Sequence, residues 1–524
     1  MPFRREPEPG GSKPSVRRDP DVIVIGSGVN GLSAAARLAR SGLSVLVLEA
    51  SPRRPGGAVG CYDATLPGFV HDFGAGFFPL ARVSAAFREL PVERHGVSWL
   101  NAEIESVHPA LDGSSASIVR LDAEQGEGDG YFGSARDTER WRRIMRQHAA
   151  IERELFAALL GPLPGVRALL RLGIGSLVRL GTWFAASGRL LSQRWFESEA
   201  ARRVLPGLAL HSDLGPDDLA SGALGYVLAL SASSVGYAVP RGGAQRLTDA
   251  LVTLIELSGG EVRLGARVAR VVVKGRRACA VRLASGEEIA ARRAIVADTA
   301  PRALLLDLLE RDAVPRWALR AARRFRHGWG TFKVDWALTG PVPWRDERAR
   351  RSATVHVGES IDDLRRFTRE VRAGRLPTEP YLVVGQQSLI DPTRAPAGCH
   401  TLYAYTHVPS ALEGGWDAAR DRFADLVESR IERLAPGFRE LVLARSVLSP
   451  VELERADENL VGGDLGGGAN GLGQQLVFRP FFPAFRYRMP VDGLYLCSSS
   501  THPGGGTHGM CGYNAAGRVL DDLT

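Results

Sequence analysis

The stretch Asp21-Val-Ile-Val-Ile-Gly-Ser-Gly-Val-Asn-Gly31 decides the fold of this 524-residue chain. It reads as a buried strand that runs into a turn made of three glycines. The alanine-rich segment 32–40 follows directly and predicts a helix. A second apolar strand, 43–48, then ends in Glu49. This order of strand, glycine turn, helix, strand and acid is typical of a dinucleotide-binding Rossmann unit.

Each residue of this pattern has a physical task. Gly26 permits the tight turn, Gly28 lets a diphosphate approach the backbone amides, and Gly31 allows the helix to pack closely on the strand. Glu49 is placed to receive the ribose hydroxyls, while the positive end of the helix dipole faces the phosphates. The motif leaves open whether the dinucleotide is NAD or FAD.

Two further glycine-rich segments follow where a simple NAD dehydrogenase would continue its alternation of strands and helices. The first is Pro55-Gly-Gly-Ala-Val-Gly60, and the second spans 67–76 with Asp72 between its turn glycines. Because glycine permits close approach of the backbone, these segments indicate a larger ligand lying over the domain.

The C-terminal region repeats the arrangement of the first motif. Gly493-Leu-Tyr-Leu-Cys497 predicts a short buried strand, and 515–520 predicts the start of a helix. Between them lies Thr501-His-Pro-Gly-Gly-Gly506, which holds three consecutive glycines. A strand, a glycine loop and a helix in this order form a cradle for an anion.

The bulk composition limits the class of protein. A chain of this length exceeds a single hydrophobic core, so we expect at least two domains. The formal net charge is +8, but only three of the 66 basic residues are lysines (Lys13, Lys274 and Lys333), and the arginines are scattered among acids. No nucleic-acid recognition motif occurs, so we expect no nucleic-acid partner.

The cysteines and the hydropathy pattern indicate a location. Five cysteines lie far apart without a C-x-x-C pair, which favours a reducing compartment and argues against a disulfide scaffold, dithiol chemistry or a metal site. No apolar run of 18 residues occurs, and residues 1–20 read as a disordered leader. The expected location is the cytoplasm.

These motifs resemble the flavin-dependent amine oxidase and phytoene desaturase superfamily. Within it, the chain is most similar to the phytoene dehydrogenase-like branch that includes the pyridine nucleotide-disulfide oxidoreductase domain-containing protein 2 group. In that family an E-x(5)-G-G motif follows the Rossmann turn, and here the spacing from Glu49 to Gly56 is one residue longer. The segment Pro240-Arg-Gly-Gly243 matches a P-x-G-G motif, and 501–506 matches a T-H-P-G-G-G motif.

The resemblance implies FAD as cofactor and an α/β fold with a discontinuous Rossmann-type FAD-binding domain and an inserted α+β substrate domain. It assigns 21–80, 231–305 and 481–524 to the FAD-binding domain, and 81–230 and 306–480 to the substrate domain. Carried over residue by residue, the implied cofactor-binding residues are Gly26, Ser27, Gly28, Asn30, Gly31, Glu49, Ala50, Gly56, Gly57, Ala58, Val268, Ser499, Gly505, Gly506, Gly509 and Met510. Ser499 stands where relatives often have glycine, alanine or an acid.

The resemblance also implies an FAD-dependent oxidoreductase that removes a hydride from an apolar small molecule, with oxygen, a quinone or another compound as the electron acceptor. The candidate catalytic residues are Lys333 and His502. Alternation along 330–338 places Lys333 and Asp335 on one sheet face, where a solvent-exposed ion pair is the alternative interpretation. For His502 the alternative is a role in fixing the loop.

Residues 161–195 combine apolar residues with arginines, and no acid occurs between Glu154 and Glu197. This pattern predicts a peripheral contact with a membrane, or else helices that cover the substrate domain. Three other functions stay open at this point. They are a redox-neutral flavin-dependent isomerase, a non-catalytic binding protein like the Rab GDP-dissociation inhibitors, and a dehydrogenase that uses NAD alone.

Overall fold

The computed structural model describes residues 19–122 and 131–524 of the chain. Of the predicted disordered leader, residues 1–20, all but the last two lie outside the described residues.

A five-stranded parallel sheet lies at the centre of one half of the molecule, with the strand order β19-β13-β1-β2-β9. Its strands are β1 (Val22–Ile25), β2 (Val45–Leu48), β9 (Glu261–Arg263), β13 (Ala294–Ala297) and β19 (Leu494–Leu496). These strands come from three distant parts of the chain. All of β1, β2 and β13 is buried, as expected for a parallel sheet that is covered on both faces.

The two faces of this sheet are covered by different elements. Three helices pack on one face, namely α1 (Val29–Arg40), α11 (Gln245–Leu257) and α17 (Met510–Leu523). The other face packs against α12 (Arg316–Arg324) and an antiparallel sheet of β10 (Val268–Lys274), β11 (Arg277–Leu283) and β12 (Glu288–Ala290). The sheet with its two covers is therefore a Rossmann-type unit.

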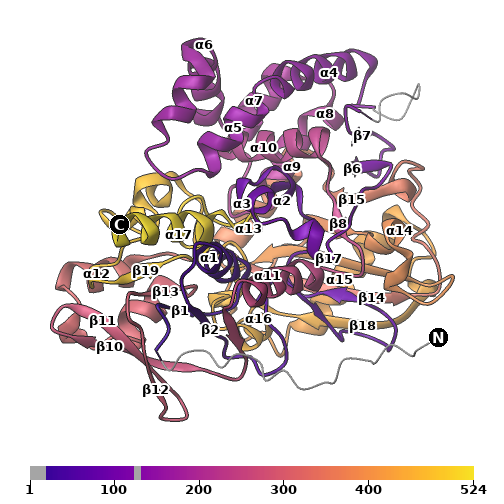
Figure 1. The fold of residues 1–524 in the computed structure, drawn as a ribbon. Coiled ribbons are helices and arrows are strands. Elements are labelled where there is room, and N and C mark those ends of the chain that lie inside the picture. The colour runs from indigo at the N-terminus through magenta and orange to yellow at the C-terminus, as the bar shows by residue number, and fades with distance from the viewer. Residues whose placement is uncertain (1–18, 123–130) are drawn as a thin grey trace, which may run out of the picture.

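A seven-stranded mixed sheet forms the second half, in the order β18-β14-β17-β16-β15-β6-β7. Its strands are β6 (Ile104–Pro109), β7 (Ser115–Ile118), β14 (Gly330–Leu338), β15 (Ser352–Val357), β16 (Leu382–Gly385), β17 (His400–Val408) and β18 (Val442–Leu448). Helix α15 (Arg420–Leu434) packs on one face, and part of the other face packs on α13 (Ile361–Arg372). Figure 1 shows this sheet beside the parallel one.

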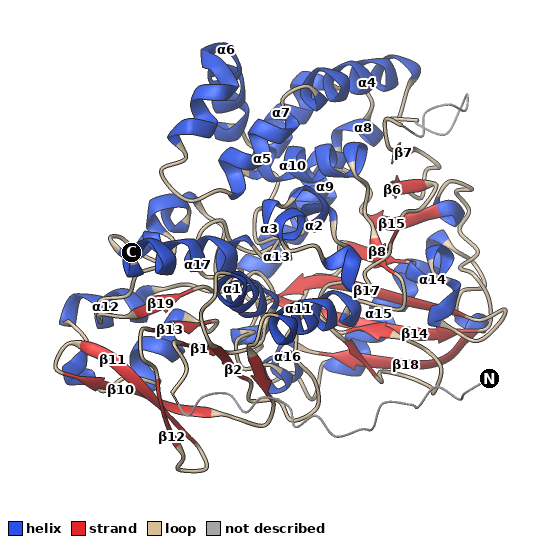
Figure 2. Cartoon of the chain, in the orientation of Figure 1, coloured by secondary structure: helices blue, strands red, loops and turns tan. Residues whose placement is uncertain are grey.

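A helical layer lies above both sheets in the view of Figure 2, where helices are blue and strands red. It consists of α4 (Ala135–Ala149), α5 (Glu152–Leu160), α6 (Val166–Ala185), α7 (Gly188–Trp195), α8 (Glu199–Arg202), α9 (Val204–Ala209) and α10 (Ser221–Ser234). The short elements are α2 (Pro79–Val83), α3 (Ala85–Glu89), α14 (Gln387–Ile390), α16 (Pro450–Ala456), β3 (Cys61–Tyr62), β4 (His71–Asp72), β5 (Trp99–Leu100) and β8 (Val239–Pro240). Across the described residues, every helix is too short or too polar to span a bilayer.

Two helices begin earlier than the sequence predicts. Helix α1 begins at Val29 and α17 at Met510, so that Gly31 and Gly512 lie inside helices. Glycine is a poor helix former, and the sequence pattern therefore places the helix start after it. Here the lack of a side chain allows these helices to pack closely, and this tertiary contact outweighs the low propensity.

Candidate functional site

The first glycine turn leaves the N-terminus of α1 open to an anion. Gly26 has a φ of 91°, a conformation that favours glycine, and the chain enters α1 directly after Gly28. No side chain caps the helix, and its first turn holds no acid. The buried Asn30 Oδ1 has no hydrogen-bond partner among the described residues. The N-terminus of α1 therefore offers the positive end of a helix dipole to a phosphate.

One carboxyl group, which the sequence did not point out, lies against this turn. The amide of Gly31 donates to Asp298 Oδ2 at 2.8 Å. A Cβ added at Gly28 would lie 2.4 Å from the same oxygen, and one at Gly26 would lie 2.9 Å from the Asp298 carbonyl. Asp298 directly follows β13, which pairs in parallel with β1, so the two strands end at the same edge of the sheet. No local pattern in the sequence indicates this contact, because it depends on the pairing of two strands that lie far apart in the chain.

Asp298 belongs to a group of acids around the turn. Burial, together with the neighbouring charges of Asp457 and Glu49, raises the pKa of Asp298 to about 7. Burial likewise raises the pKa of Asp457. Near neutral pH, Asp298 therefore carries a proton on a large fraction of molecules. A neutral carboxyl can lie beside a diphosphate without the repulsion that an ionised one would cause.

Glu49 is held in place by the glycine turn. Its Oε2 accepts hydrogen bonds from the Ser27 amide at 2.8 Å and from Ser27 Oγ at 2.6 Å. The Glu49 carbonyl accepts from the amide of Ala266 at 2.8 Å, two residues before Val268. Ala50 is exposed in the bend after β2. The predicted ribose and adenine contacts thus lie together at the end of β2.

The second glycine loop joins the first. The amide of Gly56 donates to the Ser27 carbonyl at 2.9 Å, and Gly56 forms a β-bridge with Gly28. A Cβ at Gly56 would lie 2.2 Å from the Val59 carbonyl oxygen, so the turn requires glycine. Ala58, which follows, accepts from the amides of residues 74 and 75 at 3.1 and 3.2 Å. The two loops form one continuous backbone surface.

The C-terminal loop meets the first turn through direct helix packing. A Cβ at Gly512 would lie 1.7 Å from the Asn30 carbonyl oxygen, and one at Gly509 would lie 2.6 Å from Ser33 Oγ. Gly505 and Gly506 are exposed, while Met510 is buried at the start of α17. Residues almost 500 positions apart therefore lie side by side, as α1 and α17 do in Figure 1.

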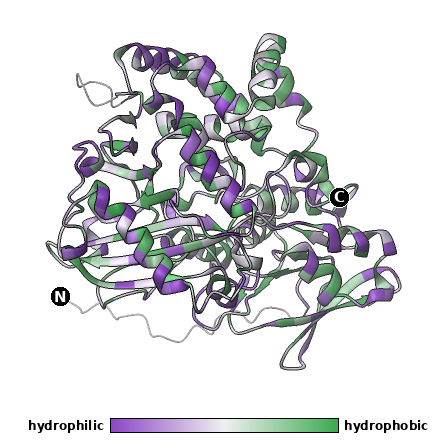
Figure 3. Ribbon diagram, turned by 180° about the vertical axis from the view of Figure 1, so that it is seen from behind, coloured by the Kyte–Doolittle hydropathy of each residue, from purple (hydrophilic) through white to green (hydrophobic). Residues whose placement is uncertain are grey.

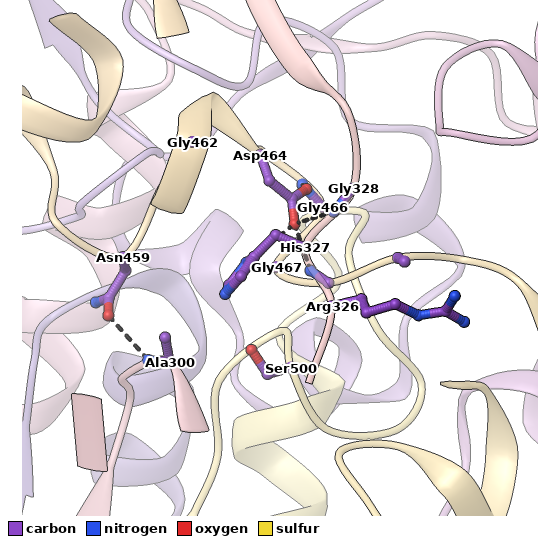
Figure 4. Close-up of polar contacts among 12 residues, drawn as sticks. Ala300, Arg326, His327, Gly328, Asn459, Gly462, Asp464, Gly466, Gly467 and Ser500 are labelled. Carbon is purple, nitrogen blue, oxygen red and sulfur yellow. Dashed lines mark hydrogen bonds and ion pairs between the residues drawn. The ribbon is translucent and has the colours of Figure 1, made fainter. Parts of the chain in front are cut away.

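A further loop, residues 462–471, supports the C-terminal loop and was missed by sequence reasoning. The Asp464 carboxylate accepts from the amides of Gly328, Gly466 and Gly468 at 2.9, 2.8 and 2.7 Å, and Figure 4 shows it among these backbone turns. A Cβ at Gly467 would lie 2.0 Å from Ser499 Oγ, so the two loops are in contact. The run of glycines in this segment was the available signal.

The buried Arg479 ties the two loops together. Its guanidinium donates to the carbonyls of Gly466 and Gly467 at 3.1 and 3.3 Å, and to that of Ser499 at 2.8 Å. Burial lowers the pKa of Arg479. The position of Ser499, a predicted cofactor residue, is thus fixed by a cation within the protein.

Lys333 is buried, so the interpretation as a solvent-exposed ion pair is wrong. Its ammonium group donates to Asp335 Oδ2 and lies 5.2 and 5.4 Å from the ring centroids of Tyr62 and Tyr403. Tyr62 donates to the same Asp335 oxygen at 2.6 Å, and His71 Nδ1 lies 3.3 Å from the other oxygen. Burial opposes ionisation of Asp335, but Lys333 and His71 outweigh it and lower its pKa.

Lys333 is connected to the second glycine loop through Tyr62. The Tyr62 ring packs edge-on against Phe73 at 5.5 Å, and Tyr62 and Ala58 both pack on the apolar cluster that Phe73 forms with Leu453 and Leu460. Ala58 directly follows Gly57 in the loop. The structure therefore places the ammonium group one layer of side chains from the predicted cofactor surface.

His502 lies in the C-terminal loop but is engaged with the helical layer. Its Nε2–H donates to the Gly161 carbonyl at 3.0 Å, and its Nδ1 has no partner among the described residues. Burial lowers the pKa of His502 to about 4, so the ring is neutral near pH 7. A neutral ring with its only N–H engaged can accept a hydrogen bond. Its predicted catalytic role stays a prediction.

A chain of buried polar side chains crosses the face of the seven-stranded sheet that carries Lys333, which pairs in register with Tyr405. Tyr405 OH lies 2.9 Å from His211 Nδ1, His211 Nε2 lies 2.8 Å from His356 Nε2, and His356 Nδ1 lies 2.9 Å from Ser106 Oγ. Burial lowers the pKa of His211 to about 3 and that of His356 well below its ordinary value. No pattern in the sequence indicated a role for His211 and His356, because one lies in the loop after α9 and the other in β15.

The site combines the parallel sheet, three converging glycine loops and the acid at the end of β2. This combination defines the class of the protein as a dinucleotide-binding oxidoreductase that is built on two sheets. FAD fits these residues, because the glycine cradles and the uncapped α1 suit its diphosphate, and Glu49 suits its ribose.

Comparison with known proteins identifies the family. The model described as "Flavin containing amine oxidoreductase" matches residues 30–369, and the chain belongs to this family. Rat "Pyridine nucleotide-disulfide oxidoreductase domain-containing protein 2" is 29% identical, over 98% of this chain and 95% of the relative. "Phytoene desaturase (lycopene-forming)" of Pseudescherichia vulneris is 27% identical, over 93% and 96%. An oxidoreductase from Methanosarcina mazei shares the fold, with a TM-score of 0.62, 15% identity and coverage of 95% and 99%.

These findings confirm the predicted family, fold class and cofactor. The chain is an FAD-dependent oxidoreductase. The alternatives of an NAD-only dehydrogenase and of a non-catalytic binding protein are therefore wrong. No finding tests the individual site residues, so their roles stay predictions.

Proposed function

We propose that this enzyme removes a hydride from an apolar small molecule, as a desaturase, a dehydrogenase or an oxidase. The observation that carries the proposal is the buried Lys333, held by Asp335 between Tyr62 and Tyr403 beside the second glycine loop. The similarity to a phytoene desaturase over most of both chains supports an apolar substrate, since phytoene is a hydrocarbon. Bound FAD supplies the hydride acceptor.

The residues of this chain then position the reaction and exclude water. Asp335 orients the Lys333 ammonium group, and removal of either partner would leave a buried charge without compensation. The rings of Tyr62 and Tyr403 limit its movement. Lys333 Nζ is thus a fixed cation on the sheet face next to the predicted cofactor surface, where it would stabilise the negative charge that bound FAD would gain with the hydride.

Replacing Lys333 by methionine should lower kcat on the order of 100-fold while the protein still purifies with flavin. The reason is that methionine keeps the volume but removes the fixed positive charge. Lys274→Met is the matched control, because Lys274 is exposed at the end of β10. The measurement is the rate at which substrate bleaches the flavin band at about 450 nm under anaerobic conditions.

Asp335 is left without its cation in this variant, so the double variant Lys333→Met/Asp335→Asn is needed alongside it. If the double variant folds, retains flavin and bleaches at the wild-type rate, Lys333 has no part in the reaction. Candidate hydrocarbons are tested as substrates in the same assay. Polar amines that bleach the flavin while hydrocarbons do not would contradict the apolar substrate.

A redox-neutral isomerisation remains the second candidate within the same family. Such an enzyme would convert substrate only after reduction of the flavin by dithionite, and its spectrum would not change during turnover. Net oxidation predicts the opposite result, with bleaching of the oxidised enzyme and no need for dithionite. The anaerobic assay therefore separates the two.

A further inference from the structure

Helix α6 carries apolar side chains that face away from the protein. Leu170, Ile174 and Val178 are 73%, 82% and 64% exposed. Only two of its leucines, Leu172 and Leu180, are fully buried. Figure 1 shows α6 at the upper edge of the helical layer, and in Figure 3 the same helix is largely green, the colour of hydrophobic residues. Exposed apolar groups on a connected surface mark an interaction site.

The arginines beside these side chains lack acidic partners. Arg167 and Arg171 are exposed and form no ion pair with any residue that the structure describes. Other exposed arginines do form such pairs, as Arg267 does with Glu458 at 2.8 Å and Arg282 with Glu288 at 2.9 Å. No acid occurs between residues 154 and 197, so neither arginine has an acidic neighbour along its own helix. This surface is therefore apolar and positively charged at once.

The shape of α6 suits a helix that lies on a membrane surface. Gly173 has φ 73° and ψ 153°, values outside the helical range, and divides α6 into two shorter halves. Val166, Leu169 and Leu170 lie on the first half, and Ile174 and Val178 on the second. Each half is too short to cross a hydrocarbon core, which requires about 20 residues.

We propose that the α6 face, defined as Val166, Leu169, Leu170, Ile174 and Val178 with Arg167 and Arg171, docks on a bilayer that contains anionic phospholipid. The apolar side chains enter the boundary between headgroups and acyl chains, and the guanidinium groups pair with lipid phosphates. The unpaired arginines favour an anionic surface over an apolar protein partner. This docking does not depend on the substrate or on Lys333.

The α6 face is linked to the cofactor side of the molecule. The carbonyl of Gly161, at the end of α5, accepts from His502 at 3.0 Å, and the carbonyl of Leu160 accepts from Asn514 Nδ2 at 2.9 Å. His502 belongs to the C-terminal glycine loop, and Asn514 belongs to α17. Docking through α6 would therefore hold the C-terminal glycine loop at a fixed position relative to the bilayer.

The test is sedimentation of the flavin-loaded protein with vesicles of phosphatidylcholine, with and without phosphatidylglycerol. We expect wild type to sediment with the anionic vesicles and to be released at high salt. Arg167→Glu/Arg171→Glu should weaken binding by at least about 25-fold, since the loss of each arginine charge near such a surface costs about fivefold and the added glutamates are repelled by it. Leu170→Asp/Ile174→Asp should weaken it by about tenfold or more.

Two control variants carry the same chemical changes elsewhere. Leu257→Asp changes a leucine that is 72% exposed at the end of α11, and Arg276→Glu reverses an exposed arginine between β10 and β11. Both should sediment like wild type. Unchanged flavin absorbance and melting temperature show that each variant is folded.

Three results would overturn the proposal. The first is that wild type stays in solution when anionic vesicles sediment. The second is that the α6 variants sediment like wild type, and the third is that the control variants lose as much binding as the α6 variants. Gel filtration tests whether the α6 face instead contacts a second copy of the chain. In that case wild type would be a dimer, and the α6 variants would be monomers with unchanged vesicle binding.

Discussion

Replacing Gly512 by alanine should separate α1 from α17 and yield a protein with little bound flavin. The added Cβ would lie 1.7 Å from the Asn30 carbonyl oxygen and 2.6 Å from the Asn30 carbonyl carbon. Both are backbone atoms, so one helix must move. We expect a loss of about 3 kcal/mol in the free energy of unfolding, although alanine has the higher helix propensity by about 1 kcal/mol. Flavin absorbance per protein and the melting temperature measure the effect.

Gly517→Ala is the matched control in the same helix. A Cβ at Gly517 would lie 2.8 Å from Arg37 Nη1, the movable end of a long side chain. This variant should keep its flavin and melt within a few degrees of wild type. If Gly512→Ala also retains full flavin, the packing of α1 against α17 does not shape the cofactor site.

Replacing Asp298 by asparagine should stabilise the flavin-free protein above neutral pH. Burial raises the folded-state pKa of Asp298 to about 7, while the ordinary value is 3.8. Between these values the folded protein holds a proton that the unfolded chain has released, so the contribution of Asp298 to stability falls as pH rises through this window. Above pH 7 the full cost is present, about 4 kcal/mol. Asparagine carries no charge and still accepts from the Gly31 amide.

The comparison is the difference in free energy of unfolding between Asp298→Asn and wild type, measured from pH 4 to pH 8. It should be near zero at the acidic end and should grow until about pH 7. Flavin retention during dialysis should also fall above pH 7 in wild type and less in the variant, since an ionised Asp298 repels the diphosphate. A difference that does not change with pH would contradict this assignment.

Asp464→Asn provides a control of opposite sign. Burial opposes ionisation of Asp464, but His327 and the amides of Gly328 and Gly466 outweigh it and lower its pKa. A carboxyl whose pKa is lowered on folding stabilises the protein above its unfolded pKa, and this contribution is lost as pH falls through the folded value. Asp464→Asn should therefore be less stable than wild type at neutral pH.

The local signals in the sequence predicted the cofactor-binding half well. The strands at 22–25, 45–48 and 494–496 were recognised because they are short, wholly apolar runs, and glycine directly adjoins the first and the last of them. Strand β14 was predicted with its bounds and its two faces. The interpretation that one face of β14 is exposed to solvent was wrong. The alternation of side chains shows which residues share a face, but it does not show what packs against that face. Here both faces of β14 are buried, so Lys333 and Asp335 form an internal ion pair.

Other features of the site could not be predicted from a single sequence. Asp298 reaches the first glycine turn only because β13 pairs with β1, although 267 residues separate Asp298 from Gly31. Asp464 and Arg479 act on the C-terminal loop through contacts that no local pattern announces. His356 and His211, which contact each other, come from β15 and from the loop after α9.

The sequence by itself determined the family, the cofactor and the three glycine loops, because tight turns and close backbone approach require glycine at fixed positions along the chain. Only the tertiary structure decided which acids lie beside the first turn, that Lys333 is buried, and that α6 presents unpaired arginines and apolar side chains outward. These properties depend on burial and on partners distant in the chain. Both arise when the sheets and helices pack together, and neither is encoded in local spacing.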